Sequence, residues 1–268
     1  MTVLIKYPYE TKEVINNFIL RKQKELTGED FAKWAGWMDT DGAISKGKSS
    51  KKVSVVLSLK DKSPVELFSK IFETSLCYRE GKTRPPKYVR EMYPHMQDKI
   101  YTSKIYNSRI NSKDKVEWVA AKIYPYLLKP EKKDYVTKVL GYTPESKNLS
   151  DWTRQELINY VCTAIEGDGG FELRRKSMVM GFYSSDSEYV SLIKYILEEK
   201  LNLPEFNLYE RHSYNTLQGE RTKYALKKCF SQKSSFEYND FLKEMIEAMT
   251  MDRKKQMIID YLKINEVE

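Results

Sequence analysis

The chain has 268 residues, of which 41% are hydrophobic and 31% charged, enough for one large or two smaller globular domains with a packed core. It has no apolar run near the ~20 residues of a membrane-spanning helix and no secretory pattern at its N-terminus, so we expect an intracellular protein that is not secreted. A net charge of +8 favours a polyanionic partner, while two histidines and three scattered cysteines exclude a His–Cys zinc site and a disulfide framework.

The first half of the chain predicts alternating helices and strands after an N-terminal extension. Residues 1–28 form this extension, which we expect to be helical around 14–24. A helix then ends at Asp39-Thr40-Asp41-Gly42, and two strands follow, one of them predicted by apolar residues at alternate positions of 53–59. After these we expect a helix, two more strands around 78–79 and 100–110, and helices at about 113–128 and 131–140.

The second half repeats this pattern. Glu166-Gly167-Asp168-Gly169 matches the first motif at an offset of 127, and Lys254-Lys255 matches Lys132-Lys133 at an offset of 122. A slowly drifting offset is what short loop deletions between fixed elements would give, so we interpret the chain as a duplication. We therefore divide it into a first repeat at 29–141, a linker rich in turn residues at 142–152, and a second repeat at 153–268.

Asp41 and Asp168 each stand at the expected end of a helix, directly before a glycine. The glycine is an ordinary helix stop, because glycine adopts the left-handed backbone conformation without strain. A carboxylate is less ordinary there, because the helix dipole is negative at that end and prefers a cation. Two such ends side by side would require a compensating cation, and carboxylate oxygens select hard ions such as Mg²⁺.

Small residues on the two motif helices suggest how these ends could meet. Gly36 and Thr40 share one face of the first helix, and Thr163 and Gly167 share the matching face of the second. Without large side chains between them, the two backbones can approach closely. This packing would bring the two aspartates to one point and leave the other motif acids, Asp39 and Glu166, one step from that face.

These features resemble a monomeric, two-repeat LAGLIDADG homing endonuclease. The family motif corresponds to 34–42 and, more loosely, to 161–169, and the resemblance covers about 30–262. It implies an α+β fold of tandem αββαββα repeats related by pseudo-twofold symmetry, with saddle-shaped antiparallel sheets and the two motif helices at the domain interface. It also makes Asp41 and Asp168 the essential acids. The second motif departs from the family pattern at Val161, Cys162 and Thr163, but both acids are present.

The resemblance also implies a reaction. We expect hydrolysis of both strands of double-stranded DNA across the minor groove of a long, asymmetric site, leaving short 3′ overhangs. Asp41 and Asp168 are expected to hold Mg²⁺, for which Mn²⁺ can substitute, with the backbone carbonyls of Thr40 and Gly167 as further ligands. The chain is expected to act as a monomer in the compartment that holds the target genome.

The family also uses a basic residue near each active centre, at the start of the last helix of each repeat. In the second repeat we expect this residue to be Arg253. In the first repeat, Glu131 occupies the strictly equivalent position, so Lys129 or Lys132 must take the role.

Long polar side chains at alternate strand positions can bind base edges, and neighbouring lysines can neutralise phosphates. In the first repeat the candidates are Ser45, Lys46, Lys48, Lys52, Ser54, Ser58, Arg79, Lys82, Arg84, Tyr101, Ser103 and Arg109. In the second repeat they are Glu172, Arg174, Lys176, Tyr183, Tyr209, Arg211, Lys223 and Lys227. The basic loops at 46–52 and 82–87 are expected to contact phosphates.

Two other functions stay open at this stage. The first is a binding protein on the same fold, either an RNA maturase or a DNA-binding regulator. Such a protein does not need both acids, although a maturase can keep them. The second is an unrelated carboxylate nuclease of the PD-(D/E)xK type, which needs an aspartate and a Glu-x-Lys on adjacent strands. Asp39 and Asp41 are instead expected on a helix, and no convincing Glu-x-Lys strand follows.

Overall fold

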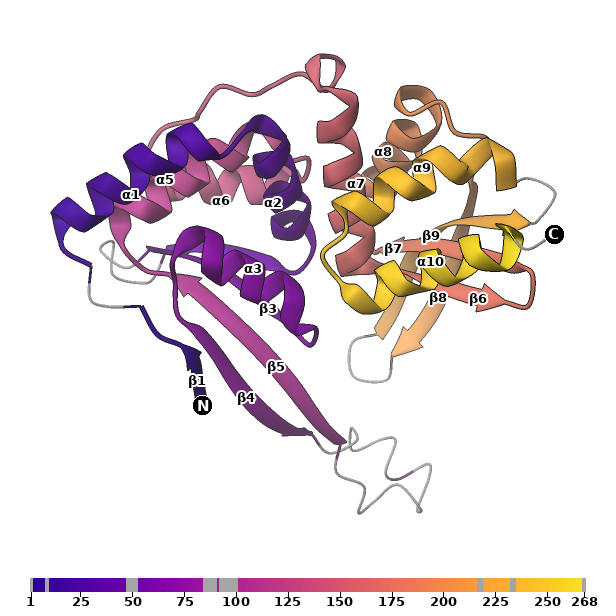
Figure 1. The fold of residues 1–268 in the computed structure, drawn as a ribbon, viewed down its shortest axis with the longest axis horizontal. Coiled ribbons are helices and arrows are strands. Elements are labelled where there is room, and N and C mark those ends of the chain that lie inside the picture. The colour runs from indigo at the N-terminus through magenta and orange to yellow at the C-terminus, as the bar shows by residue number, and fades with distance from the viewer. Residues whose placement is uncertain are drawn as a thin grey trace.

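The computed structural model describes residues 2–7, 10–46, 53–83, 91, 101–215, 219–231 and 235–266 and shows two α+β halves side by side (Figure 1). The first half contains α2 (Gly28–Thr40), β2 (Gly42–Lys46), β3 (Val53–Leu59), α3 (Lys62–Phe72), β4 (Leu76–Thr83), β5 (Tyr101–Ile110), α5 (Lys113–Ile123) and α6 (Pro130–Leu140). The second contains α7 (Arg154–Asp168), β6 (Gly169–Arg174), β7 (Ser177–Ser184), α8 (Ser187–Tyr195), β8 (Asn207–Asn215), β9 (Gly219–Ser231), α9 (Ser235–Ala248) and α10 (Asp252–Glu266). This is the predicted αββαββα order with one further helix closing each half.

Each half is built on one antiparallel sheet. With the N-terminal strand β1 (Thr2–Ile5), the strand order is β1-β4-β5-β3-β2 in the first half, and it is β6-β7-β9-β8 in the second. One face of each sheet packs into the core, because the apolar residues at alternate positions of β3 are all buried and so are Met178, Met180 and Phe182 of β7. The other face of each sheet carries the more polar residues. Among the described residues, no helix is both long and apolar enough to cross a membrane.

Helices α2 and α7 run between the two halves at the centre of the molecule (Figure 1). Both are buried along most of their length, and the hydrophobic core continues through them from one half to the other. In the first half Trp34 of α2 packs edge-on against Phe68 and Phe72 of α3, with ring centres 5.5 and 5.6 Å apart. The two halves therefore share one core, and the motif helices are its inner layer.

The N-terminal extension is part of this core. Its predicted helix is confirmed as α1 (Lys12–Glu25), whose Phe18 packs edge-on against Trp118 of α5 with ring centres 5.9 Å apart. The sequence did not predict β1 (Thr2–Ile5), which pairs with the edge strand β4, because four residues are too short to show a periodic pattern. Lys115 of α5 is 1% exposed, bonds to Glu10 and lies 4.0 Å from the ring centre of Phe18.

The glycines that follow the motif aspartates do not adopt the expected left-handed conformation. Gly42 is the first residue of β2, and Gly169 begins β6 with φ −127° and ψ −164°. Their missing side chains have a packing reason instead. A Cβ on Gly42 would lie 2.8 Å from Cα of Met38, and one on Gly169 would lie 2.5 Å from the carbonyl oxygen of Gly181. Each motif helix thus runs directly into the first strand of its sheet, with the aspartate at the junction.

Candidate functional site

The two motif helices pack through the small residues that the sequence singled out. A Cβ built on Gly36 would lie 2.2 Å from Oγ1 of Thr163, and one built on Gly167 would lie 2.2 Å from Oγ1 of Thr40. Thr163 also donates a hydrogen bond across the interface to the carbonyl oxygen of Lys33 (2.9 Å). Each helix places a glycine against a threonine of the other, and this reciprocal contact holds the C-terminal ends of α2 and α7 together.

Asp41 and Asp168 lie at these adjoining helix ends. Asp41 caps α2 and Asp168 is the last residue of α7. Oδ2 of Asp41 lies 3.0 Å from the place that a Cβ on Gly167 would take, directly beside the opposite motif. Burial raises the pKa of both carboxyls, and the charge of Asp168 raises the pKa of Asp41 further. The site therefore disfavours two charged carboxylates side by side.

Two clefts of nearly equal volume, about 480 and 490 Å³, adjoin this pair. The first is lined by Asp41, the end of β3 and the start of α10. The second is lined by Asp168, the end of β7 and Lys129, which caps α6. Each cleft thus combines the acid and a strand of one half with at least one basic residue of the other half.

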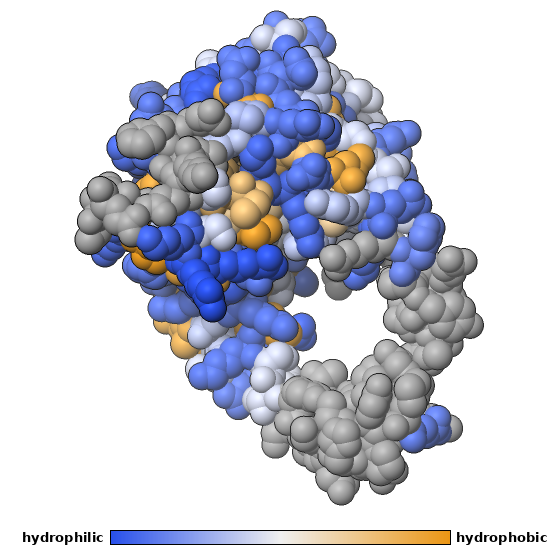
Figure 2. Space-filling model, turned by 90° about the vertical axis from the view of Figure 1, so that its right-hand side faces the viewer, coloured by the Kyte–Doolittle hydropathy of each residue, from blue (hydrophilic) through white to orange (hydrophobic). Residues whose placement is uncertain are grey.

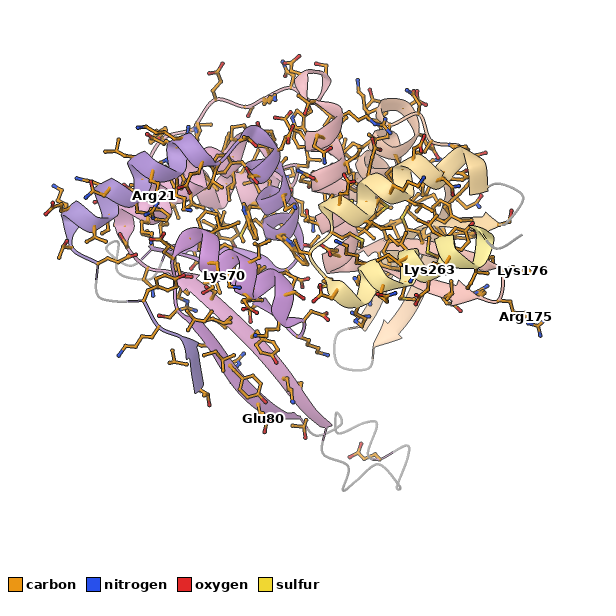
Figure 3. The ribbon with its side chains drawn as sticks, viewed as in Figure 1. Arg21, Lys70, Glu80, Arg175, Lys176 and Lys263 are labelled. Carbon is orange, nitrogen blue, oxygen red and sulfur yellow. The ribbon has the colours of Figure 1, made fainter. Side chains whose placement is uncertain are left out.

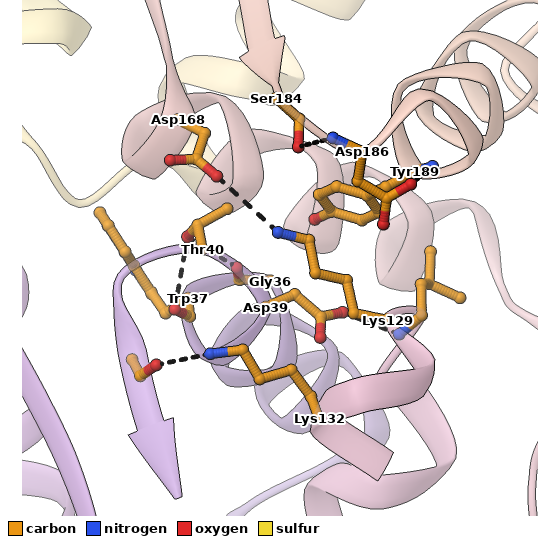
Figure 4. Close-up of polar contacts among 12 residues, drawn as sticks. Gly36, Trp37, Asp39, Thr40, Lys129, Lys132, Asp168, Ser184, Asp186 and Tyr189 are labelled. Atoms are coloured by element: carbon orange, nitrogen blue, oxygen red, sulfur yellow. Dashed lines mark hydrogen bonds and ion pairs between the residues drawn. The ribbon is translucent and has the colours of Figure 1, made fainter. Parts of the chain in front are cut away.

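Three lysines surround the acid pair. Nζ of Lys129 lies 4.0 Å from Oδ2 of Asp168, and Lys132 donates to the carbonyl oxygen of Gly42 (2.9 Å) (Figure 4). Lys254, the equivalent of Lys132, donates to the carbonyl oxygen of Gly169 (2.7 Å). Their charges lower the pKa of both aspartates against the effect of burial. Burial lowers the pKa of Lys132 and brings that of Lys254 to about 8.

At the start of α10 the structure brings Lys254, and not the predicted Arg253, to the end of the motif helix. Lys254 is 5% exposed and its ammonium binds three carbonyl oxygens at the end of α7. Arg253 lines the cleft of Asp41, but its side chain is 64% exposed and lies 3.3 Å from the carboxylate of Asp61. The match between Lys132-Lys133 and Lys254-Lys255 was the sequence signal that could have identified Lys254.

The other two motif acids, Asp39 and Glu166, are fully buried. Oδ2 of Asp39 accepts a hydrogen bond from the backbone N–H of Leu128 (2.7 Å). Glu166 accepts hydrogen bonds from the backbone N–H groups of Thr250 (2.7 Å) and Met251. These partners lie just before α6 and α10. Asp39 therefore fixes the segment before Lys129 and Lys132, and Glu166 fixes the segment before Lys254. Burial raises the pKa of Asp39 to about 6.

Strand register places most of the DNA-binding candidates on the face of each sheet that is turned away from the core. In the first sheet this face carries Ser45, Ser54, Ser58, Arg79, Ser103 and Arg109. In the second it carries Glu172, Arg174, Tyr183, Tyr209, Lys223 and Lys227. Ser58 of β3 and Tyr183 of β7, which line the two clefts, belong to these outward faces. Each polar sheet face therefore extends to the cleft at its end.

Some of these side chains already contact one another. Nζ of Lys227 lies 5.8 and 5.9 Å from the ring centres of Tyr183 and Tyr209, which are 40% and 46% exposed. Arg174 and Glu172 form an ion pair at 2.8 Å. Lys176 lies in the turn after β6, at the edge of the molecule (Figure 3). Hydrophilic residues dominate the end of the molecule that Figure 2 shows, with apolar residues scattered among them.

Several candidates cannot be placed in this way. Lys48, Lys52 and Arg84 lie outside the described residues, as do most of the loops at 46–52 and 82–87. Four more belong to described strands, but their side chains are outside the description: Lys46, Lys82, Tyr101 and Arg211.

The fold is that of the LAGLIDADG homing endonucleases, as predicted. It is similar to I-GzeII, solved in complex with its DNA target, with a TM-score of 0.52, 11% sequence identity and coverage of 90% of each chain. Weaker similarities are to I-WcaI, bound to its DNA recognition sequence (TM-score 0.46, 14% identity, 94% of each chain), and to the N-terminal LAGLIDADG domain of WhiA (TM-score 0.40, 10% identity, 94% of this chain and 100% of that one). No family model and no curated protein matches the chain.

This fold excludes the PD-(D/E)xK nuclease. Asp39 lies within α2 and Asp41 caps it, whereas that class needs its acids on adjacent strands.

Proposed function

We propose that this chain is a site-specific DNA endonuclease that hydrolyses both strands of its target across the minor groove and leaves short 3′ overhangs. The observation that carries the proposal is the convergence of Asp41 and Asp168 at adjoining helix ends, each in a cleft completed by basic residues of the other half. A purely structural role does not account for two adjoining carboxylates whose charged forms are both disfavoured by partial loss of solvent.

The residues at this point fit a hard divalent cation, Mg²⁺ with Mn²⁺ as a substitute. Asp41 and Asp168 would hold it, with the backbone carbonyls of Thr40 and Gly167 as further oxygen ligands. Within the described ranges no group of three or more His, Cys, Asp and Glu side chains could hold a metal ion, so water and DNA phosphate would supply the remaining ligands. When bound there, such an ion would lower the pKa of the attacking water and neutralise the leaving 3′ oxygen.

The lysines beside the acid pair act on negative charge. Lys129, beside Asp168, is placed to bind a phosphate oxygen. Lys254, whose N–H donors already bond carbonyl oxygens, acts beside Asp41 through its charge and would stabilise the negative charge that develops during hydrolysis. Asp39 and Glu166 hold the segments that carry these lysines. Because Lys129 lines the cleft of Asp168 and Lys254 lines the cleft of Asp41, each cleft takes a lysine from the other half, and both halves must be docked for either centre to work.

The outward sheet faces are placed to bind DNA on either side of the clefts. The two faces differ: at the end of β3 stands Ser58, where the end of β7 has Tyr183, which adjoins Lys227. Two different faces read two different half-sites, so the target is long and asymmetric. Since one chain holds both halves, it acts as a monomer, in the compartment that holds the target genome.

The proposal is tested with DNA selected by the protein itself. Duplexes that bind in Ca²⁺ are enriched over successive rounds from a randomised library and are then exposed to Mg²⁺ at fixed ionic strength. We expect the wild type to cut both strands at fixed positions. Asp41→Asn and Asp168→Asn should still bind the selected duplex but should not cut it. Binding without cutting in Mg²⁺ or Mn²⁺ would identify a DNA-binding regulator, and preference for RNA over every duplex would identify a maturase.

A further inference from the structure

The two clefts hold their basic residues in different ways. Lys129 directly follows Leu128, whose backbone N–H binds Asp39. In the other half the corresponding residue is Met251, directly before the last helix. Met251 is buried, and its backbone N–H donates to the carboxylate of Glu166. Lys129 therefore has no counterpart across the pseudo-twofold axis.

Lys129 lies over the face of a tyrosine. Its Nζ is 4.4 Å from the ring centre of Tyr189, in α8, and 4.0 Å from Oδ2 of Asp168 (Figure 4). The Lys129 side chain is only 11% exposed, and a cation–π contact is stronger when water is excluded. The ring thus fixes the ammonium group at the distance from Asp168 that the structure shows.

Tyr189 is itself held by a chain of hydrogen bonds that returns to the first half. Its hydroxyl lies 3.0 Å from that of Tyr160, and Tyr160 donates to Oδ2 of Asp39 (2.5 Å). Burial raises the pKa of both phenols, so both stay protonated and can donate. Asp39 therefore holds Lys129 twice, through the backbone of Leu128 and, by way of two tyrosines, through the ammonium group.

The described residues around Asp41 contain no equivalent arrangement. The places that correspond to Tyr160 and Tyr189 are occupied by Lys33 and Pro64. The ammonium of Lys254 is held by main-chain carbonyl oxygens instead of a ring.

We propose that Tyr189, fixed by Tyr160, is a positioning residue for Lys129 and therefore controls hydrolysis of one DNA strand only, the strand whose phosphate enters the cleft of Asp168. The inference rests on the proposed nuclease function and extends it, because it makes the two strand cleavages depend on different residues.

The test uses the selected duplex with its two strands labelled separately. Lys129→Met, which copies Met251, identifies the dependent strand. We expect Tyr189→Leu to slow cleavage of that same strand by about tenfold, because it loses one desolvated cation–π contact. Nicked duplex should therefore accumulate during the reaction. Tyr189→Phe and Tyr160→Phe keep both rings and should slow the same strand by less.

Two comparisons separate positioning from stability. In the Lys129→Met background, Tyr189→Phe and Tyr189→Leu should have no further effect, because no ammonium remains to be placed. Tyr124→Leu is the matched control: its ring lies 5.4 Å from Nζ of Lys133, outside both clefts, and both strand rates should be unchanged.

The Phe variants create no large cavity, so they decide the matter if Tyr189→Leu does not fold. Equal slowing of both strands, or slowing that persists without Lys129, would overturn the inference, as would normal cutting of both strands by Lys129→Met. A wild-type protein that cuts neither strand would instead refute the nuclease function.

Discussion

Gly36 in α2 lies so close to Thr163 in α7 that a Cβ on the glycine would stand 2.2 Å from the threonine Oγ1 and 2.5 Å from the carbonyl oxygen of Tyr160. The carbonyl belongs to the main chain and cannot rotate away. Gly36 therefore sets the distance between the helices that end in Asp41 and Asp168, and the acid pair depends on it.

Gly36→Ala should lower the free energy of unfolding by about 1–3 kcal/mol, the usual cost of overpacking, although alanine is intrinsically the better helix former by about 1 kcal/mol. Urea denaturation followed by circular dichroism measures this. Gly170→Ala is the control, because a Cβ there would meet no atom within 4 Å, and its stability should change by less than about 0.5 kcal/mol. An unchanged midpoint for Gly36→Ala would contradict the close packing of α2 and α7.

Asp41→Asn and Asp168→Asn should abolish cleavage of the selected duplex without lowering thermal stability at pH 7 in EDTA. Burial raises the pKa of both carboxyls above the unfolded value, so their charged forms destabilise the fold at neutral pH and a neutral amide removes that cost. Melting temperatures and cleavage rates are measured on the same samples. Full activity in either variant would remove that aspartate from the active site.

Asp39 should make stability depend on pH in the acid range. Burial raises its pKa from 3.8 to about 6, so between these values the folded state holds a proton that the unfolded state has lost. Stability therefore falls as the pH rises from about 4 to about 6, by an amount on the order of 3 kcal/mol for this group.

Asp39→Asn keeps an acceptor for Leu128 and Tyr160 and has no charge to lose. The difference in unfolding free energy between the wild type and this variant, measured in EDTA from pH 3.5 to 7, isolates the effect of Asp39. A difference that does not change with pH would mean that the carboxyl titrates alike in both states.

Lys254→Met should slow cleavage far more than Arg253→Ala. The ammonium of Lys254 is fixed at the end of α7 and is the cation that lowers the pKa of Asp41 most, whereas Arg253 is exposed and paired with Asp61. Single-turnover rates in Mg²⁺ compare the two variants. A larger loss in Arg253→Ala would instead favour Arg253 as the basic residue of this cleft, as the sequence predicts.

DNA binding in Ca²⁺ should weaken with salt, with a slope of about −0.9 in log K against log salt for each neutralised phosphate. If Lys227 contacts a phosphate, Lys227→Ala should make this slope shallower by about one. Lys70→Ala, on α3 away from the polar sheet face, should leave it unchanged (Figure 3). Fluorescence anisotropy over a range of KCl concentrations measures the slope, and equal slopes for the wild type and Lys227→Ala would place Lys227 outside the phosphate contacts.

The sequence by itself determined the order of elements, the duplication and the position of the acid pair. Each of these is written in local patterns: the alternation in 53–59 predicts a strand, and the repeated acid-x-Asp-Gly marks the end of a helix. The small residues Gly36 and Gly167 even identified the faces through which the helices pack, because a helix face can be read from residues four apart.

Only the tertiary structure shows which basic residues lie beside which acid. Lys129 meets Asp168, and Tyr160 links Asp39 to Tyr189, across an interface between segments far apart in the chain, so no local pattern records these contacts. At the start of α10, two neighbouring residues could have faced the end of α7. Only one of them does, because neighbouring positions on a helix point about 100° apart. That rotation sends Lys254 to the buried end of α7 and Arg253 to the surface, and only the packing of α10 against the rest of the fold fixes it.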